Sequence, residues 1–396
     1  MKKLSVFLCL LTVLLTGCSN PYQETAEVQE ITEKYSSPHS TNVISLSAVA
    51  EESDSPYTIQ DVRNLRDFLL NRPTEENLSG KSYDLDNDNV WTVFDLCLMK
   101  RAILGDAIRD DLPVVYMTKE ITSDSLMNAY LALDWTPEGK TAVKLSTGEP
   151  PASNYLRPEL IQDVVQYVEG TIVECNTAYG GSRSSTAIHY QVAEDHGFTE
   201  IADVQILDEN GSMTLPVEGG SVLTENYVGA AFADYDSYLI LSHFKGHAMA
   251  GFGGAIKNIS IGLGSSEGKS WIHTGGTSKS GFSGNQDKFL ESMAEAGKSV
   301  SDYLGDKIAY VNVMNRLSVD CDCSGRPSEP DMHDIGILSS SDPVALDQAC
   351  IDLVYSAEDG ASLIQRVESR NGLHTLEHSE EIGLGSREYQ LVILDD

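Results

Sequence analysis

From residue 114 onward, short apolar runs alternate with longer stretches whose apolar positions recur every three or four residues. The short runs have the length and the β-branched content of buried strands, and the longer stretches have the spacing of amphipathic helices. The first three pairs are Val114–Met117 with Ser123–Leu133, Thr141–Leu145 with Pro158–Val168, and Ile172–Cys175 with Ser184–His196. This alternation predicts an α/β fold in which helices flank a layered, largely parallel sheet.

The same kind of pattern continues to the end of the chain. Further strands are expected at Val204–Leu207, Tyr238–Leu241, Ile308–Val313, Ile335–Leu338 and Tyr389–Leu394, and helices at Gln286–Leu304 and Asp342–Val354, followed by two short helices before the last strand. We therefore expect residues 107–396 to form one α/β domain.

Polar and glycine-rich residues gather directly after four of these strands. The decorated segments are Ser146–Glu149, Asn176–Arg183, Ser242–Asn258 and Ser339–Pro343. In an open α/β sheet, ligands bind at the ends of the strands, so these segments are the candidates for a site.

The segment Ser242–Asn258 holds the densest set of reactive groups. His243 and His247 are four residues apart and could share one helix face and a metal, or act as acid and base together with Lys257. Positive charge and glycine amides are typical of anion sites. The expected anion-binding residues are Lys245, Gly251, Gly253, Gly254 and Asn258, with Asn176, Arg183 and Asp342 from the neighbouring strand ends. Histidine pairs are also common as structural residues and glycine turns as packing devices, but their density here favours a site.

The N-terminus has the features of an export signal. Two lysines follow Met1, an apolar run covers Leu4–Leu15, and Gly17-Cys18 ends it. The run is shorter than the roughly 20 residues that span a bilayer. The ending resembles the bacterial lipobox, which implies removal of residues 1–17 and a lipid on Cys18; a plain secretory signal is the alternative. We expect a protein on the cell surface, lipid-anchored to the outer face of the cytoplasmic membrane, with residues 18–48 as a flexible tether.

Oxygen-bearing residues follow a regular spacing between residues 84 and 95. Positions 1, 3, 5, 7, 9 and 12 of this loop are Asp84, Asp86, Asp88, Val90 (through its carbonyl), Thr92 and Asp95. A calcium ion collects six or seven oxygens from such a loop, so we expect calcium here. The alternative is an acidic, solvated turn.

The calcium loop belongs to an internal repeat. Tyr57–Leu70 aligns with Trp91–Leu104 at an offset of 34 residues, and both copies predict a helix, so the two helices should pack face to face. Residues 49–106 resemble a dockerin, the module that attaches cellulosomal proteins to a cohesin. The resemblance implies a cohesin domain of a scaffold protein as partner, within a polysaccharide-degrading assembly. The first copy lacks its first ligand, so we expect one calcium ion, in the second copy.

A second resemblance covers residues 112–394. His243–Asn258, with Asn176–Arg183 upstream and Ser341–Cys350 downstream, is similar to an uncharacterised family catalogued as domain of unknown function 362. The family has no agreed reaction. Many members are described as iron–sulphur-centre proteins because they carry ferredoxin-type cysteine runs. This chain has no such run, so no cysteine motif supports an iron–sulphur cluster or another metal.

Four cysteines fall in the expected α/β domain, namely Cys175, Cys321, Cys323 and Cys350. Only Cys321 and Cys323 are close in sequence, and outside the cell a disulfide or buried free thiols are the plainer expectation. A metal stays the alternative because acidic residues and a histidine crowd the same loop: Asp320, Asp322, Asp331, His333 and Asp334.

The chain has a formal charge of -33, from 60 acidic and 27 basic residues among 396, which argues against a nucleic-acid partner. The sequence therefore predicts an exported, lipid-anchored protein. Its calcium-binding dockerin-like module would carry an α/β domain with enzymatic, redox or metal-related activity on an anionic ligand. The alternative is a non-catalytic surface scaffold or adaptor.

Overall fold

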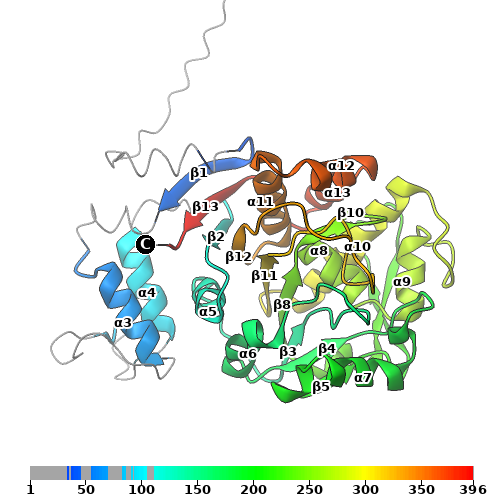
Figure 1. The fold of residues 1–396 in the computed structure, drawn as a ribbon, viewed down its shortest axis with the longest axis horizontal. Helices are drawn as coiled ribbons and strands as arrows, with labels where there is room; N and C mark the ends of the chain where they lie inside the picture. Colours follow the sequence, from blue (N-terminus) through cyan, green and yellow to red (C-terminus); the bar gives the residue numbers. More distant parts are fainter. Residues whose placement is uncertain are drawn as a thin grey trace, which may run out of the picture.

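The computed structural model describes residue 34 and residues 37–45, 55–69, 83–85, 91, 93–104 and 111–395. At its centre lies a nine-stranded sheet (Figure 1). In spatial order its strands are β1 (Ser40–Ser45), β13 (Tyr389–Ile393), β2 (Val114–Thr118), β12 (Gly336–Ser340), β11 (Ile308–Met314), β8 (Ser237–His243), β3 (Thr141–Lys144), β4 (Thr171–Glu174) and β5 (Val204–Ile206). Only β12 runs antiparallel to its neighbours, so the expected largely parallel α/β sheet is confirmed.

Helices cover both faces of this sheet. Their bounds are α5 (Ser123–Leu131), α6 (Pro158–Tyr167), α7 (Thr186–Asp195), α8 (Ala255–Lys257), α9 (Ser266–His273), α10 (Gln286–Leu304), α11 (Pro343–Ser356), α12 (Ala361–Ser369) and α13 (His374–Glu381). Strand β8 shows how one run of residues serves two cores: Tyr238 and Ile240 pack with α10 and α11, whereas Leu239 and Leu241 pack with α5 and α6. Burial on both faces explains why the strands are apolar throughout and do not alternate.

The predicted elements lie within a few residues of the observed ones, and the helix Gln286–Leu304 has the expected bounds. Short elements went unpredicted. These are the hairpin β6 (Ser212–Pro216) with β7 (Glu225–Gly229), the hairpin β9 (Lys245–His247) with β10 (Gly251–Gly253), helix α9, and a π-turn at Asn258–Gly262. Three-residue strands rich in glycine carry no periodic signal.

The expectation of a flexible tether over residues 18–48 is wrong for its last part. Ser40–Ser45 form β1, which pairs in parallel with the edge strand β13. Val43 and Ile44 are buried in the cores on opposite faces of the sheet. A strand this short is stabilised by its partner, which lies about 350 residues away and leaves no local signal.

The two helices expected in the repeat are present as α3 (Ile59–Leu69) and α4 (Val93–Leu104), and they pack on each other. Their apolar positions are buried in the same core as α5, and Lys100 Nζ donates to Asn128 Oδ1 at 3.0 Å. Within the predicted calcium loop, the Leu85 N–H donates to Asp95 Oδ1 at 2.6 Å. Cys18, Asp86, Asp88, Val90 and Thr92 lie outside the described residues, so the lipid and calcium sites stay predictions.

No helix among the described residues combines the length and the apolar character needed to cross a membrane.

Candidate functional site

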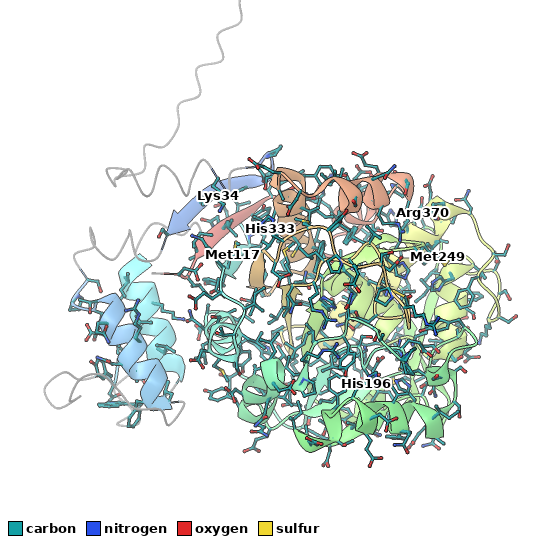
Figure 2. The ribbon with its side chains drawn as sticks, in the orientation of Figure 1. Lys34, Met117, His196, Met249, His333 and Arg370 are labelled. Atoms are coloured by element: carbon teal, nitrogen blue, oxygen red, sulfur yellow. A yellow bond between two sulfur atoms is a disulfide. The ribbon has the colours of Figure 1, made fainter. Side chains whose placement is uncertain are left out.

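A cavity of about 270 Å³ opens at the carboxyl ends of β3, β4 and β8. The β9–β10 hairpin, α8, α9 and the loop that follows β11 complete its wall. The side chain of Gln286, at the start of α10, holds this wall in place. Its Nε2 donates to the carbonyls of Met249 and Arg370 at 2.8 Å each, and both residues are labelled at the same end of the molecule in Figure 2. The cavity therefore lies at the edge of the sheet where α/β proteins bind ligands.

The cavity wall carries more positive than negative side chains. The cations are Lys144, Arg183, Lys245, Lys257 and Lys269, and the carboxylates are Glu174 and Asp322. In a chain with a formal charge of -33, such an excess of buried cations is unusual and favours an anionic ligand.

Glu174, at the end of β4, neutralises two of these cations. Its carboxylate accepts from Arg183 Nη1 at 2.9 Å and from Lys144 Nζ at 3.3 Å, and also from the Thr147 N–H at 2.9 Å. Burial opposes ionisation of Glu174, but Lys144 and Arg183 outweigh it and lower the pKa to about 2. The carboxylate is therefore ionised at neutral pH and fixes both cations.

Asp322 holds a second cluster of charges. It accepts from Lys245 Nζ and lies 3.0 Å from His243 Nδ1, whereas His243 Nε2 lies 2.6 Å from the Asn315 carbonyl oxygen. Lys245 and His243 overcome the effect of burial and hold the pKa of Asp322 well below its usual range. Burial and Lys245 lower the pKa of His243 although Asp322 opposes them. Because both ring nitrogens of His243 already face protein oxygens, this ring braces the loop that follows β11.

Lys257, the last residue of α8, differs from the other lysines. Among the described residues, its ammonium has neither a hydrogen-bond acceptor nor an ion-pair partner. Burial against the cavity, reinforced by the charge of Lys245, lowers its pKa to about 7. Lys257 can therefore gain or lose a proton at neutral pH, as a general base or acid requires.

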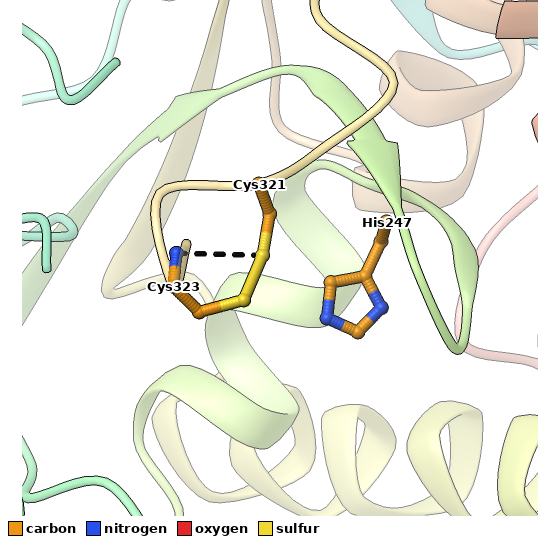
Figure 3. A group of neighbouring side chains, drawn as sticks. All are labelled: His247, Cys321 and Cys323. Atoms are coloured by element: carbon orange, nitrogen blue, oxygen red, sulfur yellow. Dashed lines mark hydrogen bonds between the residues drawn. A yellow bond between two sulfur atoms is a disulfide. The ribbon is translucent and has the colours of Figure 1, made fainter. Parts of the chain in front are cut away.

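His247, on β9, faces the disulfide between Cys321 and Cys323 (Figure 3). Its Nδ1 accepts from the Ala250 N–H at 2.9 Å and the Met249 N–H at 3.3 Å. Burial, reinforced by Lys257, lowers the pKa of His247 well below its usual value, so the ring is neutral and its proton is on Nε2. Figure 3 shows this nitrogen on the side of the sulfur atoms.

A metal does not fit these three residues as they stand. One possible ligand atom from each of His247, Cys321 and Cys323 lies within 4.8 Å of the others. However, the two sulfurs are bonded to each other, and the ring nitrogen that faces them carries the proton. An iron–sulphur cluster is usually held by four thiolates, and two of the four cysteines of this domain are joined in the disulfide. The other cysteine of the wall, Cys175, donates to the Leu263 carbonyl, and burial raises the pKa of its thiol to about 12.

The cavity brings together most, but not all, of the predicted site residues. His243, Lys245, His247, Gly253, Gly254, Lys257, Asn258 and Arg183 line it. Three predicted residues do not line it. Asn176 Nδ2 donates to Thr186 Oγ1 at 2.9 Å, Asp342 caps helix α11, and Gly251 packs against Gly372. These three residues therefore lie outside the cavity wall, and Asp342 shows that a polar residue at a strand end can serve to cap the next helix.

One further detail of the prediction is corrected. His243 and His247 lie on strands β8 and β9, so they do not share a helix face. Beyond the glycine segment, the first two amides of α8 are already occupied, because the Ala255 and Ile256 N–H groups donate to Asp347 at 2.7 and 3.0 Å. A Cβ on Gly254 would lie 2.2 Å from Asp347 Oδ1, so glycine is present for close packing.

Sequence reasoning missed several residues of the wall, in particular Lys144, Glu174, Thr177, Lys269 and His273. Thr177 Oγ1 is buried and has no hydrogen-bond partner among the described residues. A signal existed for Lys144 and Glu174, since each is a charged residue at the end of an apolar strand, where burial requires a partner or a ligand.

The cysteines of the α/β domain match the expected bridge or buried thiols. Cys321 and Cys323 form a disulfide, and Cys175 and Cys350 are free and buried. The acidic residues and the histidine of the loop that follows β11 do not converge on one point, and only Asp322 among them lines the cavity. The other four form hydrogen bonds with separate partners: Asp320 with Ser328, Asp331 with Ser362, His333 with Asp359, and Asp334 with the Arg316 N–H.

Fold and cavity together define an α/β protein with a cationic cavity at the carboxyl edge of its sheet. The model of one family, described as "Domain of unknown function (DUF362)", matches residues 141–352, which is more than half of the chain. The protein belongs to this family, and the matched range contains every residue that lines the cavity.

Among solved structures, the chain is similar to the structure of the lactate racemase apoprotein from Thermoanaerobacterium thermosaccharolyticum. The identity is 13% and the TM-score is 0.39, and the match covers 61% of this chain and 57% of that chain. No curated protein matches the sequence.

Proposed function

We propose that the α/β domain is an enzyme that binds a small carboxylate- or phosphate-bearing molecule in the cationic cavity and transfers a proton through Lys257. The observation that carries this proposal is the position of Lys257, which is half-buried in the cavity wall and has no ion-pair partner among the described residues. Burial lowers its pKa to about 7. Buried amines without a carboxylate partner are costly to a fold, so their presence in a cavity points to a ligand.

The charges of the wall indicate which groups would meet the ligand. Glu174 offsets Lys144 and Arg183, and Asp322 offsets Lys245. Lys257 and Lys269 have no ion pair among the described residues, although Lys269 Nζ donates to the Gly264 carbonyl at 2.5 Å. These two ammonium groups supply the charge that an anion would balance.

The wall also contains uncharged polar residues. One of them is Thr177, whose hydroxyl oxygen is buried and has no hydrogen-bond partner among the described residues. The volume of about 270 Å³ lies near the lower end of the range for ligand pockets, roughly 300–1,000 Å³, and so favours a small molecule.

Calorimetric titration of the purified protein with phosphate, acetate and propionate tests this proposal. We expect binding of at least one of these anions to weaken about tenfold in Lys257→Met, because one buried charge is lost. Lys307→Met is the matched control, since Lys307 pairs with Glu138 on the surface. Equal affinity in Lys257→Met and wild type would overturn the proposal. Absence of binding to any anion would favour the non-catalytic scaffold or adaptor instead.

We also propose that this domain is exported and held through a lipid on Cys18 at the outer face of the cytoplasmic membrane. The basic start, the short apolar run and the Gly17-Cys18 ending support the proposal.

A calcium-loaded, dockerin-like module would then attach the protein to a cohesin domain within a polysaccharide-degrading assembly. Support comes from the regular ligand spacing between Asp84 and Asp95, and from the packing of α3 on α4.

A further inference from the structure

We propose that Cys321 and Cys323 form a redox-active disulfide that exchanges with a small anionic thiol bound in the cavity. The proposal rests on the proposed function, because the same cations would hold the anionic group of the thiol. It adds a second chemical activity and names the class of substrate.

The first observation is the position of the disulfide. Both cysteines line the cavity, and Asp322 between them accepts from Lys245. A ligand held by the cations therefore lies next to the S–S bond. A disulfide with only a structural role needs no such exposure to a ligand cavity, and a span of one intervening residue constrains very little chain.

The second observation is the donor set around one sulfur. The Cys323 N–H donates to Cys321 Sγ at 3.4 Å, and the protonated Nε2 of His247 faces the two sulfurs. Hydrogen bonds and positive charge stabilise a thiolate and lower the pKa of its thiol. Cys321 is therefore equipped as the leaving group.

The two cysteines also differ in exposure. Cys321 is 4% exposed, whereas Cys323 is half-buried. An incoming thiolate would attack Cys323 Sγ and form a mixed disulfide, and the S–S bond would break with its electron pair on Cys321 Sγ. A second thiolate would attack the sulfur of the bound thiol, release Cys323 as a thiolate, and leave as the symmetrical disulfide. Two thiols are thus oxidised, the protein disulfide is reduced by two electrons, and the two thiol protons end on Cys321 and Cys323 or in solvent.

The tautomer of His247 favours this chemistry over metal binding. A metal bound at Nε2 would require the ring proton to move from Nε2 to Nδ1. Nδ1 cannot take the proton while it accepts a hydrogen bond from the Ala250 N–H. An Nε2–H group is suited to a thiolate, which accepts a hydrogen bond.

The test compares three thiols of similar size, 3-mercaptopropionate, 2-mercaptoethanol and cysteamine, acting on the native protein. Reduction of the Cys321–Cys323 bridge is followed by alkylation and mass spectrometry of the peptide that carries both cysteines, and rates are expressed per thiolate. We expect the anionic thiol to react about tenfold faster than the cationic one, because the wall steers negative charge. Lys257→Met should remove this preference, and Lys307→Met should keep it.

Variants of His247 test the second observation. His247→Phe removes the N–H donor and should slow reduction by 3-mercaptopropionate about tenfold. His247→Gln keeps an N–H donor, so it should react faster than His247→Phe. If His247→Phe were slow only because it had unfolded, a donor at this position would not restore the rate. Circular dichroism verifies the fold of both variants.

Several outcomes would overturn the inference. They are equal rates for the three thiolates, resistance of the bridge to all of them, or tight binding of one Zn²⁺ by the reduced protein without exchange. Propionate, which has no thiol, separates this failure from a failure of the proposed function. If propionate binds in a Lys257-dependent way while the bridge shows no charge preference, only the redox inference fails. If neither propionate nor the other test anions bind, the proposed function fails as well.

Discussion

At the scale of single residues, the partner of each lysine decides its role. Lys144 and Lys245 are buried and Lys257 is half-buried against the same cavity, but Glu174 and Asp322 balance the first two. Lys257 has no such partner among the described residues, so its proton is the one most easily exchanged near pH 7. The proposed proton transfer therefore depends on Lys257 having no carboxylate partner among the described residues.

The first prediction concerns the pH dependence of anion binding. Below about pH 7 Lys257 is an ammonium, and above it a neutral amine, whereas acetate stays ionised throughout. We expect acetate affinity to fall about tenfold between pH 6 and 8.5, and Lys257→Met to bind weakly at every pH. Calorimetry at four pH values measures this slope, and a wild-type affinity that does not change with pH would contradict the assignment.

The second prediction concerns stability without ligand. The pKa of Lys257 in the folded protein, about 7, lies below the usual 10.5, so the unfolded chain binds more protons between these values and stability rises with pH there. Below pH 7 the buried ammonium therefore destabilises the fold. Lys257→Met should raise the free energy of unfolding at pH 6 by on the order of 1–2 kcal/mol, and by less at pH 10. Urea denaturation of Lys257→Met and of the control Lys307→Met at both pH values measures this difference. If Lys257→Met gained the same stability at pH 6 and pH 10, the amine of Lys257 would not titrate between them.

At the scale of elements, the cavity depends on how closely α8 approaches α11. Asp347, on α11, accepts from the first two amides of α8 and from Asn312 Nδ2 of β11 at 2.7 Å. Burial raises the pKa of Asp347 to about 6 although these donors favour its ionised form. The carboxylate thereby joins three elements at the base of the site.

The third prediction tests this junction. Gly254→Ala places a methyl group 2.2 Å from Asp347 Oδ1, so we expect a loss of about 1–3 kcal/mol and a weaker anion site. Gly297→Ala, in the middle of α10, meets Ile259 only at 3.4 Å and should be neutral or slightly stabilising. Urea denaturation compares the two variants. Equal stabilities would show that the hairpin can move away from Asp347 at little cost.

At the scale of the whole molecule, the N-terminal part is joined to the α/β domain by packing as well as by the chain. Strand β1 extends the central sheet at β13, and α4 contacts α5 (Figure 1). Ser37 Oγ donates to Asp352 Oδ2 at 2.8 Å, which fastens the segment before β1 to α11.

The fourth prediction is that calcium stabilises the module that contains α3 and α4. Asp84, Asp86, Asp88 and Asp95 repel each other without a cation, so a chelator should lower the helical signal and the melting temperature. Circular dichroism with and without chelator measures both. Asp86→Asn should weaken calcium binding, whereas Asp124→Asn, outside the loop, should not. A melting curve insensitive to the chelator would refute the calcium site.

The fifth prediction is that Cys18 anchors the protein. Cys18→Ala removes the acyl acceptor, so the protein should stay unprocessed or leave the membrane fraction, and Cys97→Ala should behave as wild type. Fractionation of cells followed by immunoblotting measures the distribution. Unaltered partitioning of Cys18→Ala would mean that another feature holds the protein to the membrane.

Much of the fold could be predicted from local patterns. The strand Ile308–Met314 and the helix Gln286–Leu304 follow from runs of apolar residues and from helical spacing, because each residue's environment repeats along its own element. The segment Ser242–Asn258 was recognised for the same reason, since its reactive residues are close in sequence. The short β9 and β10 and the edge strand β1 have no repeating pattern, and only their partners stabilise them.

The sequence by itself determined the α/β class, the family, the residues that crowd one strand end, and the spacing of the proposed calcium and lipid sites. Only the tertiary structure decided which charges remain unbalanced. His243 meets Asp322 across 79 residues and Lys144 meets Glu174 across 30, whereas Lys257 forms no ion pair with any carboxylate of the described residues. Hydrogen bonds and ion pairs act over about 3 Å in space, and no periodicity along the chain records which distant side chains come within that distance.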